Sequence, residues 1–176
     1  MNQIFKNQVS SVPVKLCLAV AVIVLILDQL TKVLTEKFIK AAITVIPGFF
    51  NLIYVRNPGA AWGILAGKGG LLLIISIAVL ILIIIYIRKL TEGWMERYLS
   101  VSLICGGILG NSLDRILRGS VVDFLDVYVG THHWPAFNVA DSAICIGVFI
   151  FVISSWARPQ DQGENPSPKL RAPDNI

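Results

Sequence analysis

The chain has 176 residues, of which 55% are hydrophobic and 15% are charged, and its formal net charge is +4. A soluble domain of this length is rarely so apolar, and no basic run is interleaved with aromatic residues. The composition therefore predicts a one-domain membrane protein, mainly α-helical, whose basic residues lie at the membrane borders. It excludes a nucleic-acid-binding module, and we expect no nucleic-acid partner.

Long apolar segments predict four membrane-spanning helices. The second segment is free of charged residues until Arg88 and Lys89 close it. The third contains Gly106, Gly107 and Gly110, a spacing that predicts a small face on which helices pack closely in lipid. The tail is rich in proline and charge, a composition typical of disorder. The predicted spans are residues 16–34, 69–87, 98–113 and 139–156, and the predicted tail is residues 159–176.

Two connections join these spans on the same side of the membrane. The first, residues 41–67, contains two short β-prone runs, Ile43–Ile46 and Phe49–Val55. These runs predict a small sheet that lies on the membrane surface. The second connection, residues 115–137, contains Asp123 and Asp126.

A pair of histidines, His132 and His133, lies in the second connection. Adjacent side chains diverge, and no other cluster of ligands has a suitable spacing. We therefore expect no metal site and no cofactor.

Polar residues gather in five clusters at or near this same membrane face. Polar residues at a helix end often cap the helix or meet lipid headgroups, so each cluster alone has a structural explanation. Five clusters on one face favour a functional site. The clusters are Asp28–Lys32, Asn57–Ala61, Gly110–Arg115, Val121–Phe124 and Phe137–Ser142.

Asp123 and Asp141 are the strongest catalytic candidates, because a carboxylate at the border of a membrane span is costly. Two carboxylates in contact do not both ionise readily, so they share a proton. The ionised member can take a proton from water, while the neutral member polarises a carbonyl and protonates the leaving nitrogen. This is peptide hydrolysis without an acyl-enzyme. The structural alternative for Asp141 is a helix cap or an ion pair with Arg115.

Supporting roles are expected for seven further residues. Asparagine amides can hold a substrate backbone or orient a carboxylate, and a glycine allows close backbone approach. An aspartate and a lysine four residues apart lie on one helix face and can pair there. Arg115 follows Asp114 directly, so it can neutralise that aspartate or, alternatively, bind a lipid phosphate. The seven residues are Asn57, Gly59, Asn111, Arg115, Asn138, Asp28 and Lys32.

In their order and approximate spacing, the five clusters resemble those of lipoprotein signal peptidase, also called signal peptidase II. The resemblance covers residues 16–157. Asp123 and Asp141 match the family's catalytic pair, and the seven supporting residues match its first motif and the positions around its substrate site. Trp62 departs from the pattern, since phenylalanine is expected after Gly-Ala-Ala.

The resemblance implies a four-helix membrane fold with a small extracytoplasmic β-sheet, the β-cradle, within a peptidase domain of residues 1–158. It implies an aspartic endopeptidase of the bacterial cytoplasmic (inner) membrane that cleaves diacylglyceryl-modified prolipoproteins just before the lipidated cysteine. The active site is then extracytoplasmic, and the termini and tail are cytoplasmic. We expect a monomer whose partners are these substrates and membrane lipid. The alternative is a small ion- or proton-conducting protein, because intramembrane carboxylates with basic partners also mark ion paths.

Overall fold

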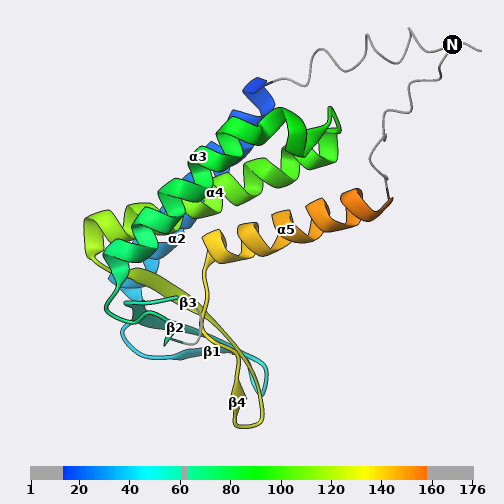
Figure 1. Ribbon diagram of the computed structural model, residues 1–176. Coiled ribbons are helices and arrows are strands. Elements are labelled where there is room, and N and C mark those ends of the chain that lie inside the picture. The colour runs from blue at the N-terminus through cyan, green and yellow to red at the C-terminus, as the bar shows by residue number, and fades with distance from the viewer. Residues whose placement is uncertain (1–13, 61–62, 158–176) are drawn as a thin grey trace, which may run out of the picture.

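The structure, a computed structural model, describes residues 14–60 and 63–157. The predicted tail and Trp62 lie outside the described residues. Within them the chain forms four long helices and four strands (Figure 1). The helices are α2 (Val14–Phe38), α3 (Gly69–Thr91), α4 (Met95–Arg118) and α5 (Val139–Ala157). The strands are β1 (Ile43–Ile46), β2 (Phe50–Asn57), β3 (Val121–Val129) and β4 (His132–His133).

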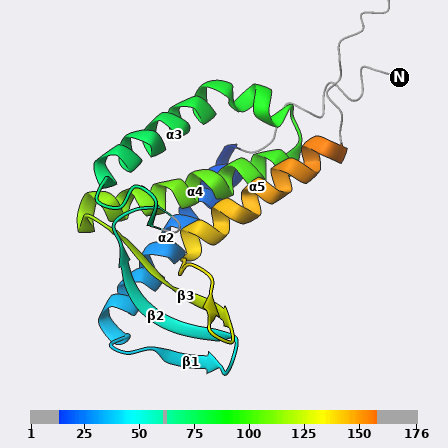
Figure 2. The ribbon, with the colours of Figure 1, turned by 60° about the horizontal axis from the view of Figure 1, so that its bottom comes forward.

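The helices lie side by side, and the sheet projects from one end of them (Figure 1). The first turn of α2 and the last turn of α5 lie at the opposite end, away from the sheet. In the rotated view, α4 lies between α3 and the other two helices (Figure 2). Every helix therefore has one end at the sheet and one end remote from it.

Three helices are long and apolar enough to cross a membrane, as the sequence predicts: Lys15–Phe38, Gly69–Thr91 and Val139–Ala157. Helix α4 is as long, with 24 residues, but one of its faces is polar. It packs against each of the other three helices, so this face lies inside the bundle. The chain is thus a multi-pass membrane protein. The span predicted at residues 98–113, which corresponds to α4, stays a prediction.

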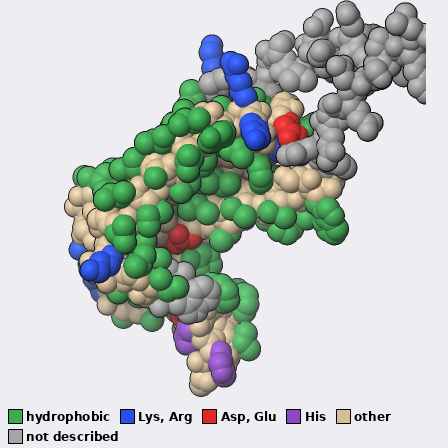
Figure 3. Space-filling view, in the orientation of Figure 1, with side chains coloured by type: hydrophobic (Ala, Val, Ile, Leu, Met, Phe, Trp, Pro, Cys, Tyr) green, Lys and Arg blue, Asp and Glu red, His purple; other side chains and the backbone are tan. Residues whose placement is uncertain are grey.

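The interior of the described part is more polar than its surface. Eight hydrophobic residues are buried there against fourteen polar or charged ones. The visible face of the helices is mostly apolar, and basic side chains gather near the ends of the helical part (Figure 3). This distribution suits helices whose outer surface meets hydrocarbon rather than water.

Glycines allow α4 to approach its neighbours closely, which confirms the predicted small face. A Cβ atom at Gly106 would lie 2.8 Å from the carbonyl oxygen of Ala21 in α2. On the other side, a Cβ atom at Gly147 of α5 would lie 2.6 Å from the carbonyl oxygen of Ser100 in α4. Backbone thus packs against backbone, as is common between membrane helices.

The strands form one antiparallel sheet in the order β1-β2-β3-β4. The predicted strand Ile43–Ile46 is confirmed as β1, and the run predicted at Phe49–Val55 corresponds to β2. No strand was predicted for residues 115–137, yet they contain β3, which pairs with β2 along most of its length. The first residues of β3 are buried on both faces, so they lack the alternation that marks a strand in sequence.

Helix α4 also continues beyond its predicted end at residue 113. The extra turn contains Asp114 and Arg118, which are four residues apart and form an ion pair at 2.6 Å. Gly119, with a φ of 74°, then ends the helix in the left-handed conformation that glycine favours. This short turn leads directly into β3.

Candidate active site

A cleft of about 470 Å³ lies where the helices meet the sheet. Both candidate aspartates line it, Asp123 from β3 and Asp141 from α5. An acidic surface is visible in the hollow between the helices and the sheet (Figure 3). Asn57, Gly59, Asn111 and Arg115 also line the cleft, together with Ala60, Val121, Trp134, Pro135, Ala136, Phe137, Ser142, Ile144 and Cys145.

Asp123 is buried near the start of β3 and accepts hydrogen bonds at both carboxylate oxygens. Asn57 Nδ2 donates to Oδ2 at 3.0 Å, and Asn138 Nδ2 donates to Oδ1 at 2.7 Å. Burial raises the pKa of Asp123 to about 6, and the negative charge of Asp141 adds to this rise. The two amides oppose it by stabilising the ionised form. Asp123 therefore changes its protonation state close to neutral pH.

Asp141 lies in the first turn of α5, where it caps the helix. Its backbone N–H donates to Asn138 Oδ1 at 2.9 Å, and its Oδ2 accepts from the backbone N–H of Asn138 at 3.3 Å. This reciprocal pattern is a capping box. Its Oδ1 also accepts from Asn111 Nδ2 at 2.7 Å. The cap alternative is thus confirmed, yet the same carboxylate lines the cleft.

Two asparagines link the carboxylates of Asp123 and Asp141. Asn138, which is fully buried, donates to Asp123 and, at 3.3 Å, to Asn111 Oδ1. Asn111 in turn donates to Asp141. A continuous chain of hydrogen bonds therefore runs from one aspartate to the other, through one residue on α4 and one at the start of α5.

Arg115 ties the loop after β2 to α4. Its guanidinium donates to the carbonyl oxygens of Gly59 and Asn111, each at 3.1 Å. The backbone N–H of Gly59 donates to Asn57 Oδ1 at 2.9 Å, which turns the amide nitrogen of Asn57 towards Asp123. A Cβ atom at Gly59 would lie 2.7 Å from the carbonyl oxygen of Ile64, so the loop is closely folded upon itself there.

Two of the alternatives considered for Arg115 are not found in the described part of the chain. It forms no ion pair with Asp141, because its guanidinium is turned to the two carbonyl oxygens. Asp114 is neutralised by Lys32 and Arg118 rather than by Arg115. Adjacent helical residues point about 100° apart, whereas residues four apart lie on one face.

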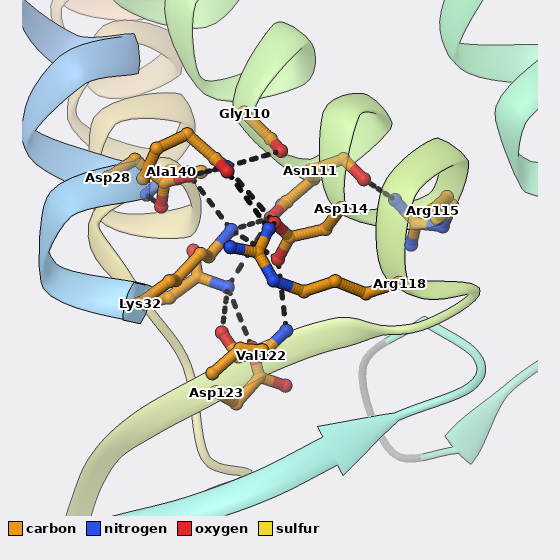
Figure 4. A network of polar contacts seen from close by, with 12 residues as sticks. Asp28, Lys32, Gly110, Asn111, Asp114, Arg115, Arg118, Val122, Asp123 and Ala140 are labelled. Carbon is orange, nitrogen blue, oxygen red and sulfur yellow. Dashed lines mark hydrogen bonds and ion pairs between the residues drawn. The ribbon is translucent and has the colours of Figure 1, made fainter. Parts of the chain in front are cut away.

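Lys32 occupies the centre of a buried polar network (Figure 4). Its ammonium group lies 2.8 Å from Asp28 Oδ2, 3.0 Å from Asp114 Oδ2 and 3.0 Å from Asn111 Oδ1. An ammonium group has three donors, and all three are used. The predicted pairing of Asp28 with Lys32 is confirmed, and neither residue is among those that line the cleft.

This network also holds the two segments that contain the cleft aspartates. Asp114 Oδ2 accepts from the backbone N–H of Val122 at 3.0 Å, and Asp28 Oδ1 accepts from that of Ala140 at 2.9 Å. Val122 directly precedes Asp123, and Ala140 directly precedes Asp141. The network thus fixes the backbone at the base of both side chains.

Sequence reasoning missed Gln29 and Arg118 in this network. Gln29 Nε2 donates to Asp28, to Asp114 and to the carbonyl oxygen of Gly110, and its Oε1 accepts from Arg118. The spacing of Asp114 and Arg118 was a usable signal, since it favours an ion pair on one helix face. Gln29 lies within the Asp28–Lys32 cluster, but no role of its own was predicted for it.

The described residues contain no group of three or more His, Cys, Asp or Glu side chains placed to bind a metal ion. His133 instead lies beside Asp126, with its Nδ1 at 2.8 Å from the carboxylate Oδ1. The side chains that line the cleft include two carboxylates, two amides and one guanidinium, together with the polar groups of Ser142, Trp134 and Cys145. Such groups can move protons and orient a peptide.

Known proteins resemble this chain over most of its length. The sequence model of the family described as "Signal peptidase (SPase) II" matches residues 20–157. A lipoprotein signal peptidase from Syntrophus aciditrophicus is 43% identical over 85% of this chain and 98% of the relative. Another from Syntrophotalea carbinolica is 45% identical over 81% of this chain and 91% of the relative.

The fold agrees with solved structures as well. A bacterial membrane enzyme solved by the in meso method at 2.3 Å resolution superposes with a TM-score of 0.78 and is 37% identical. The match covers 88% of this chain and 96% of that enzyme. A second one, solved at 1.9 Å resolution, gives a TM-score of 0.72 at 39% identity. The chain therefore belongs to the signal peptidase II family of membrane peptidases.

Proposed function

We propose that this protein is an aspartic endopeptidase that removes the signal peptide from diacylglyceryl-modified prolipoproteins, cutting just before the lipidated cysteine. Membership of the signal peptidase II family supports the reaction and the substrate class. One observation carries the assignment of the catalytic pair. Asp123 and Asp141 come from different elements, line one cleft and are linked by the amides of Asn111 and Asn138.

In the proposed mechanism, the two aspartates share one proton. The ionised carboxylate takes a proton from water, and the resulting hydroxide attacks the scissile carbonyl carbon. The neutral carboxyl polarises that carbonyl and then protonates the leaving nitrogen, so the C–N bond breaks and the pair regains one shared proton. The pKa of about 6 at Asp123, raised by burial and by Asp141, suits a group that changes its protonation state near neutral pH.

We assign supporting roles to the other polar residues of the cleft. The amide of Asn57, held by the backbone of Gly59, stabilises the ionised form of Asp123. Arg115 fixes the Gly59 loop against α4. Asn111 and Asn138 orient the two carboxylates. Asp28 and Lys32 act through the backbone of the catalytic segments rather than on the substrate.

The proposed substrate suits the position of the cleft at the end of the helices. A lipid-modified cysteine stays in the bilayer, so the scissile bond lies near the interface. We propose that α4 is the fourth span, since 24 residues of helix reach about 36 Å and its polar face is turned inwards. In the proposed orientation, the sheet and the cleft are extracytoplasmic, the termini are cytoplasmic, and the protein works as a monomer in the bacterial inner membrane.

The test is cleavage of a defined precursor by the purified protein in lipid nanodiscs. A synthetic prolipoprotein peptide carrying diacylglycerol on its cysteine should be cut just before that residue, as read by mass spectrometry. The unlipidated peptide should be cut far more slowly, because it lacks the membrane anchor that places the scissile bond. Ion flux through liposomes without any cleavage would refute the proposal and favour the ion-conducting alternative.

A further inference from the structure

One wall of the cleft is a short segment between β4 and α5. Its four residues, Trp134–Phe137, all line the cleft. Its far end is fixed by Phe137, whose backbone N–H donates to Leu125 O at 3.1 Å and whose carbonyl accepts from Leu125 at 2.9 Å. Its near end follows β4, a strand of only two residues, and the backbone N–H of Trp134 donates to Val127 O of β3 at 2.8 Å.

A line of hydrogen-bonded side chains crosses the sheet and ends beside the near end of this wall. Asn51 on β2 donates to Asp126 Oδ2 at 2.9 Å, and His133 Nδ1 lies 2.8 Å from Asp126 Oδ1. Asp126 is buried, whereas about half of the His133 side chain is exposed. The ring of His133 also stacks on Tyr128, with centroids 4.9 Å apart and planes at 11°. His133 directly precedes Trp134.

The charge state of Asp126 decides which residue donates the hydrogen bond between Asp126 and His133. Burial raises its pKa, but the hydrogen bonds from His133 and Asn51 outweigh that effect and hold the pKa below its usual range. An ionised carboxylate only accepts hydrogen bonds, so Nδ1 of His133 carries the proton of their bond. Asp126 does not line the cleft, and its influence therefore passes through His133.

We propose that Asp126 and His133 position the Trp134–Phe137 wall and thereby set how tightly the cleft binds its substrate. This inference rests on the proposed function. Neither residue touches the reacting atoms, so both are positioning residues. Loss of the bond between Asp126 and His133 frees the near end of the wall and weakens substrate binding. The catalytic step is unchanged, because the separate network around Lys32 holds the segments of Asp123 and Asp141.

The test compares three variants of the full-length protein in nanodiscs with the lipidated peptide. His133→Phe keeps a flat ring against Tyr128 but removes the bond, and it should raise KM about fivefold with kcat within about twofold of the wild type. His133→Asn places an amide donor near the position of Nδ1 and should restore KM. His132→Phe, in the adjacent residue, is the matched control and should change neither constant.

Hydrogen exchange gives a second reading that does not depend on activity. The amide of Trp134, at the near end of the wall, should exchange faster in His133→Phe than in His132→Phe, whereas the amide of Phe137, at the fixed far end, should exchange equally in both. Unchanged KM, a fall in kcat alone or unchanged exchange would overturn the inference. If the wild type cleaves no lipidated peptide, the proposed function fails, and the exchange rates then decide by themselves whether His133 holds the wall.

Discussion

Replacing Lys32 by methionine should strongly destabilise the protein. In the buried network, the charges of Asp28 and Asp114 are balanced by those of Lys32 and Arg118. Methionine keeps the apolar length of the side chain but leaves one negative charge uncompensated. The Lys32 side chain and both carboxylates have 0% exposure, so water does not screen the loss.

The expected size follows from the burial of the pair. Removing one partner of a buried ion pair costs about 3–5 kcal/mol, because the remaining charge stays in a poorly solvated site. For a chain of this size, that cost corresponds to a fall of about 10 °C in melting temperature. Activity should fall as well, since Lys32 also donates to Asn111, which holds Asp141.

Thermal unfolding in detergent, followed by intrinsic fluorescence at a fixed scan rate, measures this effect. Lys37→Met removes an exposed lysine from the same helix and should shift the melting temperature by less than about 2 °C. Lys32→Met combined with Asp28→Asn restores the charge balance, and it should melt above the single variant. The reasoning is refuted if Lys32→Met melts like Lys37→Met, or if the double variant melts below the single one.

Two further substitutions test the cleft and the helix packing. Asn57→Ala removes a hydrogen bond that favours the ionised form of Asp123, so the pKa of Asp123 rises above about 6. The limb of the pH–rate profile that reports Asp123 should then move to higher pH by about one pH unit, and an unmoved limb would contradict the role of Asn57. Gly110→Ala would place a Cβ atom 2.5 Å from Asp28 Oδ2 and should cost about 1–3 kcal/mol. Gly70→Ala, where a Cβ atom meets nothing within 4 Å, is its control, and equal melting of the two variants would count against the packing argument.

The helices were predictable because long runs of apolar residues lie between charged ones. The predicted start of α3 and both ends of α5 agree with the structure to within one residue, whereas α2 and α4 run past their predicted ends, because polar residues that normally end a span are buried here with partners. Helix α2 continues past its predicted end to Phe38. Helix α4 likewise continues to Arg118, which pairs with Asp114 one turn earlier. A pattern along the chain shows the charge but not the partner that neutralises it.

Strand β3 was missed for a related reason. Its first four residues are all buried, and Asp123 is among them. A carboxylate within an apolar run reads as a break in a strand, and the alternation that reveals a half-exposed strand is absent. Only pairing with β2 and the amides of Asn57 and Asn138 make that position acceptable for an aspartate.

The members of the site were easier to predict than their connections. The clusters of polar residues at one membrane face predicted which side chains gather near Asp123 and Asp141. They did not predict that Asp28 and Asp114 hold the backbone directly before each aspartate, because those bonds join residues far apart in sequence. They also gave no sign of the contact between Asp126 and His133, which depends on the register of β3 and β4.

The proposed pairing of Asp123 and Asp141 is tested most directly by the turnover of Asp123→Asn and Asp141→Asn on the lipidated precursor. Asparagine keeps the shape of each side chain but neither shares nor transfers the proton. We predict that each variant inserts in the membrane like the wild type and loses kcat by about 10²–10⁴-fold. A variant of either residue that keeps more than about half of the wild-type kcat would contradict the account.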